Sequence, residues 1–291
     1  MRIIFSLYVP HVMDRRVSRK VQGLVDYFDS SVILYNMTEK EIKSYEDKEL
    51  FAKTATLQLF SFDSCDKNSR LGKPTYCFSG CFYKDYILSV FHGADDKPLV
   101  TAAISIDWET RLSKQMVLAP CWLAESAINI DTGTVKEPKV IDFFLSTFKK
   151  DEHFLCEILD DDKDEVLQYE RYHFKEIAEP NLAGIYFFGG TIDNNSDDYS
   201  KRIFSKFQFA SCEFCGELEE SYGKGSFLYR FELPSRITDE NQLQGCSGAP
   251  IYDMEGKLVS LLCGGFVDTP YIYGINLSRL QPLLEMQDLW K

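Results

Sequence analysis

The chain has 291 residues and a net charge of −13, from 32 Lys and Arg against 45 Asp and Glu. Its content of 45% hydrophobic and 14% aromatic residues is typical of a globular protein and excludes a largely disordered one. The negative charge argues against nucleic acid or a membrane surface as the main partner, and no apolar run is long enough to span a bilayer.

The first 55 residues predict an appended αβ segment. Short strands at 3–9 and 31–35 alternate with two helical patterns, and Thr38 and Glu41 form a capping box before the second helix. A disposable leader would have no need of helix caps or of a regular apolar face. We therefore expect residues 1–55 to remain attached and to pack on the rest of the protein as a regulatory or partner-docking element.

From residue 56 the pattern changes to short apolar stretches broken by turns, which predicts an all-β barrel or sandwich. The strands fall into two series, assigned to domains at 56–150 and 151–291, and the periodicity of 278–290 indicates a closing amphipathic helix. The acidic run 160–164 and the loop 193–198 are expected to be solvated connections. The predicted strands are 56–62, 75–83, 86–91, 99–106, 114–122, 139–145, 154–159, 184–191, 203–213, 226–233, 249–253, 257–263 and 271–276.

A motif near the C-terminus, Gly-x-Ser-Gly-x-Pro at residues 245–250, combines the features of a nucleophile loop. A serine hydroxyl is a weak nucleophile that must be exposed beside a general base, and glycines permit the tight turn that presents it. Such a turn points the amides of Gly245 and Ser247 at one spot, where they can hold the oxyanion of a tetrahedral intermediate. The motif resembles the nucleophile loop of chymotrypsin-like serine proteases.

The base and its orienting acid are expected from the first series of strands. The stretch 78–92 resembles the family element in which a Gly-x-Phe strand turns tightly into an apolar strand that ends in the catalytic histidine, here His92. Asp142, before an apolar stretch, resembles the acidic member of the triad, and Asp131 is the alternative. The order His92, Asp142, Ser247 differs from the order in subtilisin-like and hydrolase-fold triads.

Two further segments resemble the same family. The stretch 258–265 is similar to the strand that follows the nucleophile and pairs with bound substrate, and 271–276 followed by a helix is similar to the end of bacterial trypsin-like proteases. The resemblance covers residues 55–291 and is nearest to bacterial intracellular types. It implies two packed antiparallel six-stranded β-barrels with the active site between them, and a serine endopeptidase that needs neither cofactor nor metal.

The resemblance also implies where a protein or peptide substrate would bind. The specificity pocket would be walled by residues near Asn241 and by Cys263, Gly264 and Gly265. No acid stands at position 241, which argues against cleavage after Lys or Arg, and the two glycines leave the entrance open. The alternative function, from a different class, is a catalytically silent protease-like domain that binds peptides or a partner protein by strand addition along the Gly264–Gly265 edge.

The cysteines carry three further interpretations. Their number is nine, and the start of the chain lacks the pattern of a signal peptide, which together indicate free thiols in a cytoplasmic protein. Cys212 and Cys215 have the spacing of a metal or redox pair, but buried thiols are favoured over a site shared with Cys77 and Cys81. Cys246 stands where secreted family members have an aspartate that pairs with a newly cleaved amino terminus. A neutral thiol offers that terminus no partner, so the oxyanion loop is expected to be preformed or set by a regulatory partner.

Other residues with chemical potential are assigned structural roles. His153 and His173 lie in acidic, loop-rich sequence and are expected at the surface. Gly189 and Gly190 are not followed by Lys and Ser or Thr, so they do not form a phosphate loop. Cys246 is not the nucleophile, because relatives with a catalytic cysteine carry it at the position of Ser247.

Overall fold

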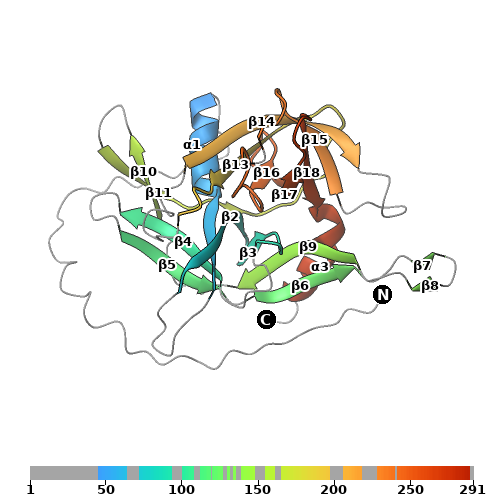
Figure 1. Cartoon of the computed structure of the whole chain (residues 1–291), viewed down its shortest axis with the longest axis horizontal. Helices are drawn as coiled ribbons and strands as arrows, with labels where there is room; N and C mark the ends of the chain where they lie inside the picture. The colour runs from blue at the N-terminus through green and yellow to red at the C-terminus, as the bar shows by residue number, and fades with distance from the viewer. Residues whose placement is uncertain are drawn as a thin grey trace.

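The computed structural model describes residues 45–63, 72–93, 100–107, 112–118, 120–126, 130–131, 134–135, 139–147, 155–160, 165–196, 206–217, 228–239 and 241–288. These residues form one helix toward each end of the chain and antiparallel strands between them (Figure 1). The elements expected in residues 1–44, as well as His11 and His153, lie outside the described residues.

The first half of the chain forms a helix, one large sheet and two small hairpins. The sheet has eight strands, seven of them in the order β5-β4-β1-β2-β3-β9-β6, while β12 pairs in parallel with β2. The hairpins are β7–β8 and β10–β11. The elements are α1 (Tyr45–Ala55), β1 (Leu57–Phe62), β2 (Pro74–Tyr83), β3 (Tyr86–Ser89), β4 (Val100–Asp107), β5 (Leu112–Leu118), β6 (Pro120–Ser126), β7 (Ile130–Asp131), β8 (Thr134–Val135), β9 (Lys139–Thr147), β10 (Leu155–Asp160), β11 (Glu165–Glu170) and β12 (His173–Phe174).

The second half of the chain forms one closed barrel followed by a helix. Its strands are connected in the cyclic order β13-β14-β15-β18-β17-β16. The barrel interior is filled by aromatic and branched side chains, among them Phe188, Phe231 and Ile272, all fully buried. The elements are β13 (Ile185–Ile192), β14 (Lys206–Glu217), β15 (Leu228–Glu232), β16 (Pro250–Tyr252), β17 (Leu258–Gly265), β18 (Tyr271–Asn276) and α3 (Leu277–Asp288).

Of the predicted pair of six-stranded barrels, one is confirmed, and it is formed by the predicted strands from 184 to 276. The strand predicted at 154–159, which begins the second series, lies instead in the hairpin β10–β11. Within the described residues, the first series forms a sheet whose two end strands, β5 and β6, are not paired with each other. The single strand predicted at 114–122 is in fact these two strands, with Pro120 at the start of β6. A proline lacks the N–H that a continuous ladder needs, so it favours the first position of a strand.

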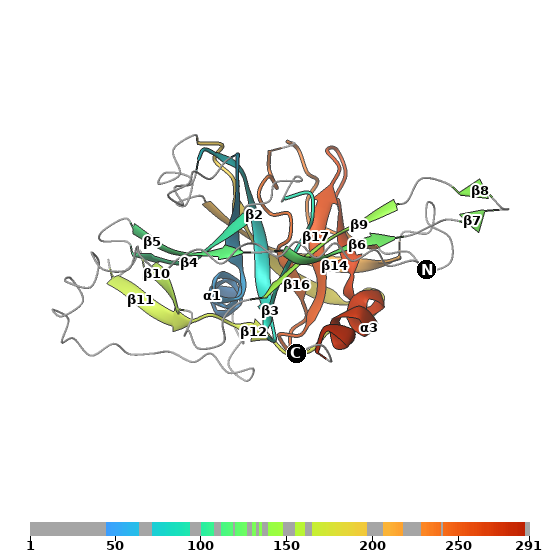
Figure 2. The ribbon, with the colours of Figure 1, turned by 90° about the horizontal axis from the view of Figure 1, so that it is seen from below.

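A shared apolar core joins the sheet, the barrel and both helices. It includes Leu88 of the sheet, Tyr252 and Leu261 of the barrel, and Leu280 of α3, each at most 1% exposed. Figures 1 and 2 show β2, in cyan, running along the boundary between the two halves. The residues that meet at this boundary are separated by more than 100 positions in the sequence, as the contact of Ser79 with Ser247 illustrates.

Helix α1 is part of this core although it belongs to the predicted N-terminal extension. Phe51 is 1% exposed, and its ring lies 4.5 Å from that of Tyr172 and 5.0 Å from that of Tyr252, between centroids. The hydroxyl of Thr56, just after the helix, donates to the carbonyl of Gly189 in the barrel. The described end of the extension thus packs against the barrel, while the division of the chain at residue 55 stays a prediction.

The two helices of the described residues can be compared with what a membrane-spanning helix requires. Neither α1 nor α3 has the length and apolar character that crossing a bilayer requires.

Candidate active site

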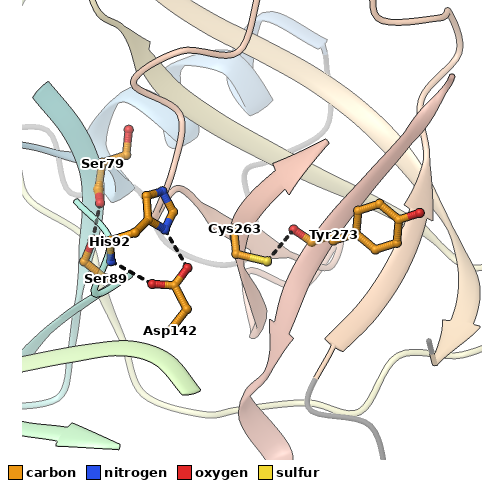
Figure 3. Close-up of polar contacts among 6 residues, drawn as sticks. All are labelled: Ser79, Ser89, His92, Asp142, Cys263 and Tyr273. Atoms are coloured by element: carbon orange, nitrogen blue, oxygen red, sulfur yellow. Dashed lines mark hydrogen bonds and ion pairs between the residues drawn. The ribbon is translucent and has the colours of Figure 1, made fainter. Parts of the chain in front are cut away.

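His92, which follows β3, and Asp142 of β9 form a two-point contact (Figure 3). The backbone N–H of His92 donates to Oδ1 of Asp142 at 2.7 Å, and the ring Nδ1 lies 2.5 Å from Oδ2. The side chains are 40% and 31% exposed, respectively. A carboxylate at Nδ1 selects the ring tautomer in which Nε2 is free to accept a proton.

The pairing of β3 with β9 explains why these two residues meet. A two-residue turn, Lys84–Asp85, joins β2 to β3 and fixes the register of that hairpin. Strand β3 then pairs with β9 so that Ser89 lies opposite Phe144. Continuing this register by two residues places Asp142 opposite Phe91, the residue before His92. Asp131, the alternative acid, lies instead in β7 of a separate two-stranded sheet.

Ser247 lies in a tight turn that is docked on β2. The backbone N–H of Ser79 donates to the carbonyl of Ser247 at 2.7 Å, and the N–H of Gly248 donates to the carbonyl of Leu262 at 2.6 Å. Gly245 and Gly248 have φ angles of 94° and 85°, a region that favours glycine. The turn therefore requires the glycines of the motif and brings Ser247 to the boundary between sheet and barrel.

The N–H groups of Gly245 and Ser247, which the sequence predicts as oxyanion donors, differ from the amide between them. Among the hydrogen bonds of the described residues, none uses the N–H of Gly245 or of Ser247. The intervening N–H of Cys246 is engaged, since it donates to the carbonyl of Leu243 at 3.0 Å. The predicted pair of donors is thus available to a bound group, while the amide between them maintains the turn.

Tyr76 of β2 lies beside His92, a position that the sequence did not reveal. Its ring lies 6.4 Å from the ring of His92 in an edge arrangement, between centroids, and packs on Phe78. Burial raises the pKa of Tyr76, and the nearby hydroxyl of Ser247 partly opposes this effect. The phenol is therefore neutral near pH 7. Tyr76 lies within a predicted strand, and nothing in the sequence around it indicates that its ring lies beside that of His92.

Cys263 extends the site toward the predicted substrate edge (Figure 3). Burial, followed by the negative charge of Asp142, raises the pKa of the Cys263 thiol to about 12. The thiol is therefore neutral, and it donates to the carbonyl of Tyr273 at 3.3 Å. Next to it, Gly264 is partly exposed and Gly265 exposed, and a side-chain carbon added at Gly264 would meet nothing within 4 Å.

Asn241, expected at the base of the specificity pocket, is an exposed residue in a turn. Its backbone N–H and side-chain amide both donate to Oδ1 of Asp239, at 2.8 and 3.0 Å. Asp239 therefore places a carboxylate next to Asn241, although position 241 itself carries no acid. The assignment of Asn241, Cys263, Gly264 and Gly265 to substrate binding stays a prediction.

Cys246 is completely buried behind the nucleophile. Its thiol lies in the barrel core, and burial raises its pKa well above the usual value, so it is neutral. Gly190 packs directly on it, because a side-chain carbon at Gly190 would lie 2.9 Å from Sγ of Cys246. The environment of Cys246 is apolar and filled.

The remaining cysteines and acidic groups form no metal site among the residues that the structure describes, in which no cluster of three or more His, Cys, Asp or Glu side chains occurs. Cys212 is buried in the barrel core, whereas Cys81 belongs to the core between sheet and barrel. Cys215 is partly exposed and donates to the carboxylate of Glu232 at 3.8 Å.

Two expectations for polar residues are wrong. Asp193, expected in a solvated loop, is only 6% exposed, because backbone N–H groups of Cys77 and Asn195 satisfy its carboxylate. His173, expected at the surface, is partly buried, and its ring stacks on that of Phe82 at 4.3 Å between centroids. In both cases the partner from β2 is about 90 or more positions away in the sequence, so no local pattern announces it.

Comparisons with known proteins agree with the fold. No family model matches the chain, and no curated protein matches it. Among solved structures, a scabies mite inactivated protease paralogue is 10% identical with a TM-score of 0.52, and the alignment covers 83% of this chain and 97% of that one. The serine endoprotease from Yersinia pestis is 11% identical with a TM-score of 0.46, covering 84% and 66%. The MamO protease domain from Magnetospirillum magneticum is 12% identical with a TM-score of 0.45, covering 80% and 96%.

The scabies mite structure is a serine protease fold, and the chain shares that fold. Of the three structures named here, the scabies mite protein has a TM-score above 0.5, and its description as inactivated is a property of that protein. At identities of 10–12%, the likeness concerns the fold and leaves the chemistry to the residues of the site.

Proposed function

We propose that the protein is a serine endopeptidase that hydrolyses peptide bonds through His92, Asp142 and Ser247. The observation that carries this proposal is the two-point contact of Asp142 with the backbone and ring of His92, in a serine protease fold. An orienting carboxylate on the Nδ1 side of an exposed imidazole has the geometry that a general base needs. The glycine turn that presents Ser247 next to two available amides supports the same function.

In the proposed mechanism, Nε2 of His92 takes the proton of the Ser247 hydroxyl as Oγ attacks the carbonyl carbon of a peptide bond. The oxyanion that forms is stabilised by the N–H groups of Gly245 and Ser247, and Asp142 stabilises the imidazolium. His92 then protonates the leaving amine, and an acyl-enzyme remains on Ser247. Water enters, gives its proton to His92 and releases the acid, which restores the serine.

A binding function is the second candidate, and the exposed backbone at the end of β17 favours it. In that case the domain would bind an extended peptide along Gly264 and Gly265, whose backbone is exposed at the end of β17. The substrate or ligand is a peptide or protein in either case.

Hydrolysis of a peptide library by the purified chain separates the two functions. A peptidase cleaves members of the library at defined bonds, whereas the Ser247→Ala and His92→Ala variants leave them intact and keep the melting temperature of the wild type. A silent domain gives the same uncleaved library for all three proteins and the same retention of peptides on an affinity column. Cleavage by Ser247→Ala at the wild-type rate would rule out the proposed nucleophile.

A further inference from the structure

The buried residue Asp193 forms hydrogen bonds with the nucleophile loop and with the sheet, and it directly follows a strand of the barrel. Asp193 directly follows β13 of the barrel and is 6% exposed. Its Oδ2 accepts the backbone N–H of Cys77 in β2 at 3.1 Å, and its Oδ1 accepts the N–H of Asn195 at 2.9 Å. A buried carboxylate is costly unless such donors satisfy it, so its position is strongly determined by them.

The backbone of Asp193 in turn fixes the first peptide of the oxyanion site. Its N–H donates to the carbonyl of Gln244 at 2.8 Å. In a planar trans peptide the C=O and the following N–H point in opposite directions. The bond that holds the Gln244 carbonyl toward Asp193 therefore turns the N–H of Gly245 away from Asp193. The side chains of Gln244 and Asn195 add two hydrogen bonds, at 3.0 and 3.2 Å.

The next two peptides of the loop are held in the same manner. The carbonyl of Gly245 accepts the hydroxyl of the buried Ser79 at 2.8 Å. The carbonyl of Cys246 accepts the N–H of Ala249 at 2.9 Å, so the N–H of Ser247 points to the opposite side of its peptide. A side-chain carbon at Gly245 would lie 2.5 Å from the carbonyl of Thr191 and 2.6 Å from the nitrogen of Asp193. The loop is thus packed closely on residues 191–193, and a peptide flip would break these bonds.

We infer that Asp193 is a positioning residue that keeps the N–H group of Gly245 in its oxyanion-binding orientation in the uncleaved chain. This inference rests on the proposed function, and it names the internal group that organises the same site. Cys246, neutral and enclosed in the core, offers no ion pair for that purpose. Neither proteolytic cleavage nor a partner protein is then required to form the oxyanion site.

The kinetics of two Asp193 variants and of a matched control variant test the positioning role of Asp193. Asp193→Ala removes both acceptors, and we expect kcat to fall about 100-fold, the effect of losing one oxyanion donor, with KM within about threefold. Asp193→Asn keeps one acceptor oxygen, and we expect its kcat to fall by about tenfold.

Asp253 provides the matched control. It also accepts two backbone N–H groups, those of Glu255 and Lys257 at 2.9 Å, but it lies in the turn that follows β16. Asp253→Ala should lower the melting temperature and leave kcat unchanged.

Hydrogen–deuterium exchange makes the test independent of catalysis. Asp193→Ala should speed amide exchange in the segment 243–249 by tenfold or more, whereas Asp253→Ala should leave that segment unchanged. If Asp193→Ala lowers kcat no more than Asp253→Ala, or leaves the exchange of 243–249 as in the wild type, the inference is wrong. If the wild type itself hydrolyses no peptide, the proposed function fails, and the exchange result still decides whether Asp193 holds the loop.

Discussion

At the scale of single residues, Asp142 holds His92 at two points, the backbone N–H and the ring. In Asp142→Asn the side chain keeps its shape, but it loses the charge that stabilises an imidazolium, and its NH2 group cannot accept from Nδ1–H. We expect the variant to melt near the wild-type temperature and to lose kcat by on the order of 10⁴. Peptide hydrolysis and a thermal melt measure both quantities, and an Asp142→Asn enzyme as active as the wild type would contradict this role.

Gly248 offers a test of the turn itself. A side-chain carbon there would lie 2.0 Å from the carbonyl oxygen of Ser79 and 2.2 Å from Oγ of Ser89, at a φ of 85°. Because that contact is with backbone, we expect Gly248→Ala to abolish peptidase activity and to lower the free energy of unfolding by about 1–3 kcal/mol. Gly264→Ala is the control, since a carbon at that glycine meets nothing within 4 Å. Equal stability of the two variants in urea would refute the predicted clash.

The sequence identifies the residue types of the site better than their partners. The glycines around Ser247 are predictable because a turn that presents a nucleophile needs them, and the φ angles of Gly245 and Gly248 agree. Asp193 is not predictable in this way. Its acceptor role depends on the N–H of Cys77, 116 residues away, whereas its own neighbours in the sequence are those of a solvated loop.

At the scale of elements, the strands of the second half were predictable because short apolar runs there are bounded by turn residues. The predicted strand 271–276 matches β18 in both bounds. In the first half, the sequence of 114–122 gives no sign of the break before Pro120. Strand β12 has two residues, too few to show the alternation of apolar and polar residues that indicates a strand. Pairing partners, and hence closure of the sheet, depend on contacts between distant strands that no local pattern encodes.

Helix α1 provides the prediction for the packing of elements. Phe51 is 1% exposed among the rings of Tyr172, Phe174 and Tyr252, so Phe51→Ala would leave a cavity in the shared core. We expect the free energy of unfolding in urea to fall by about 3–5 kcal/mol. Phe266→Ala, at a ring that is 63% exposed, should cost far less. A Phe51→Ala protein as stable as the Phe266→Ala protein would show that α1 is dispensable.

Strand β12 provides a prediction for pH. Burial lowers the pKa of His173, while its contact with the carbonyl of Lys84 and the charges of Asp85 and Glu170 partly oppose this effect. Because the folded-state pKa lies below the unfolded value of about 6.5, the unfolded chain binds the proton first as the pH falls. Stability should therefore decrease below about pH 6.5. The melting temperature should fall less between pH 7.5 and 5.5 in His173→Gln than in the wild type, and parallel curves would exclude this contribution.

At the scale of the whole molecule, the site depends on the junction between sheet and barrel. His92 and Asp142 come from the sheet and Ser247 from the barrel, and the bond from Ser79 to Ser247 crosses the junction. The shared core under this junction includes residues of α1, β3, β16 and α3. Loosening any of these elements should therefore affect the site.

The most direct test of the peptidase assignment is labelling of the uncleaved 291-residue chain with a fluorophosphonate probe. An activated serine displaces the fluoride and forms a stable phosphonate ester, without knowledge of the substrate. We predict one adduct by intact mass, located on Ser247 by tandem mass spectrometry, absent in Ser247→Ala and strongly reduced in His92→Ala. An intact chain that forms no adduct, forms one on another residue, or reacts only after cleavage between residues 53 and 75 would contradict this account.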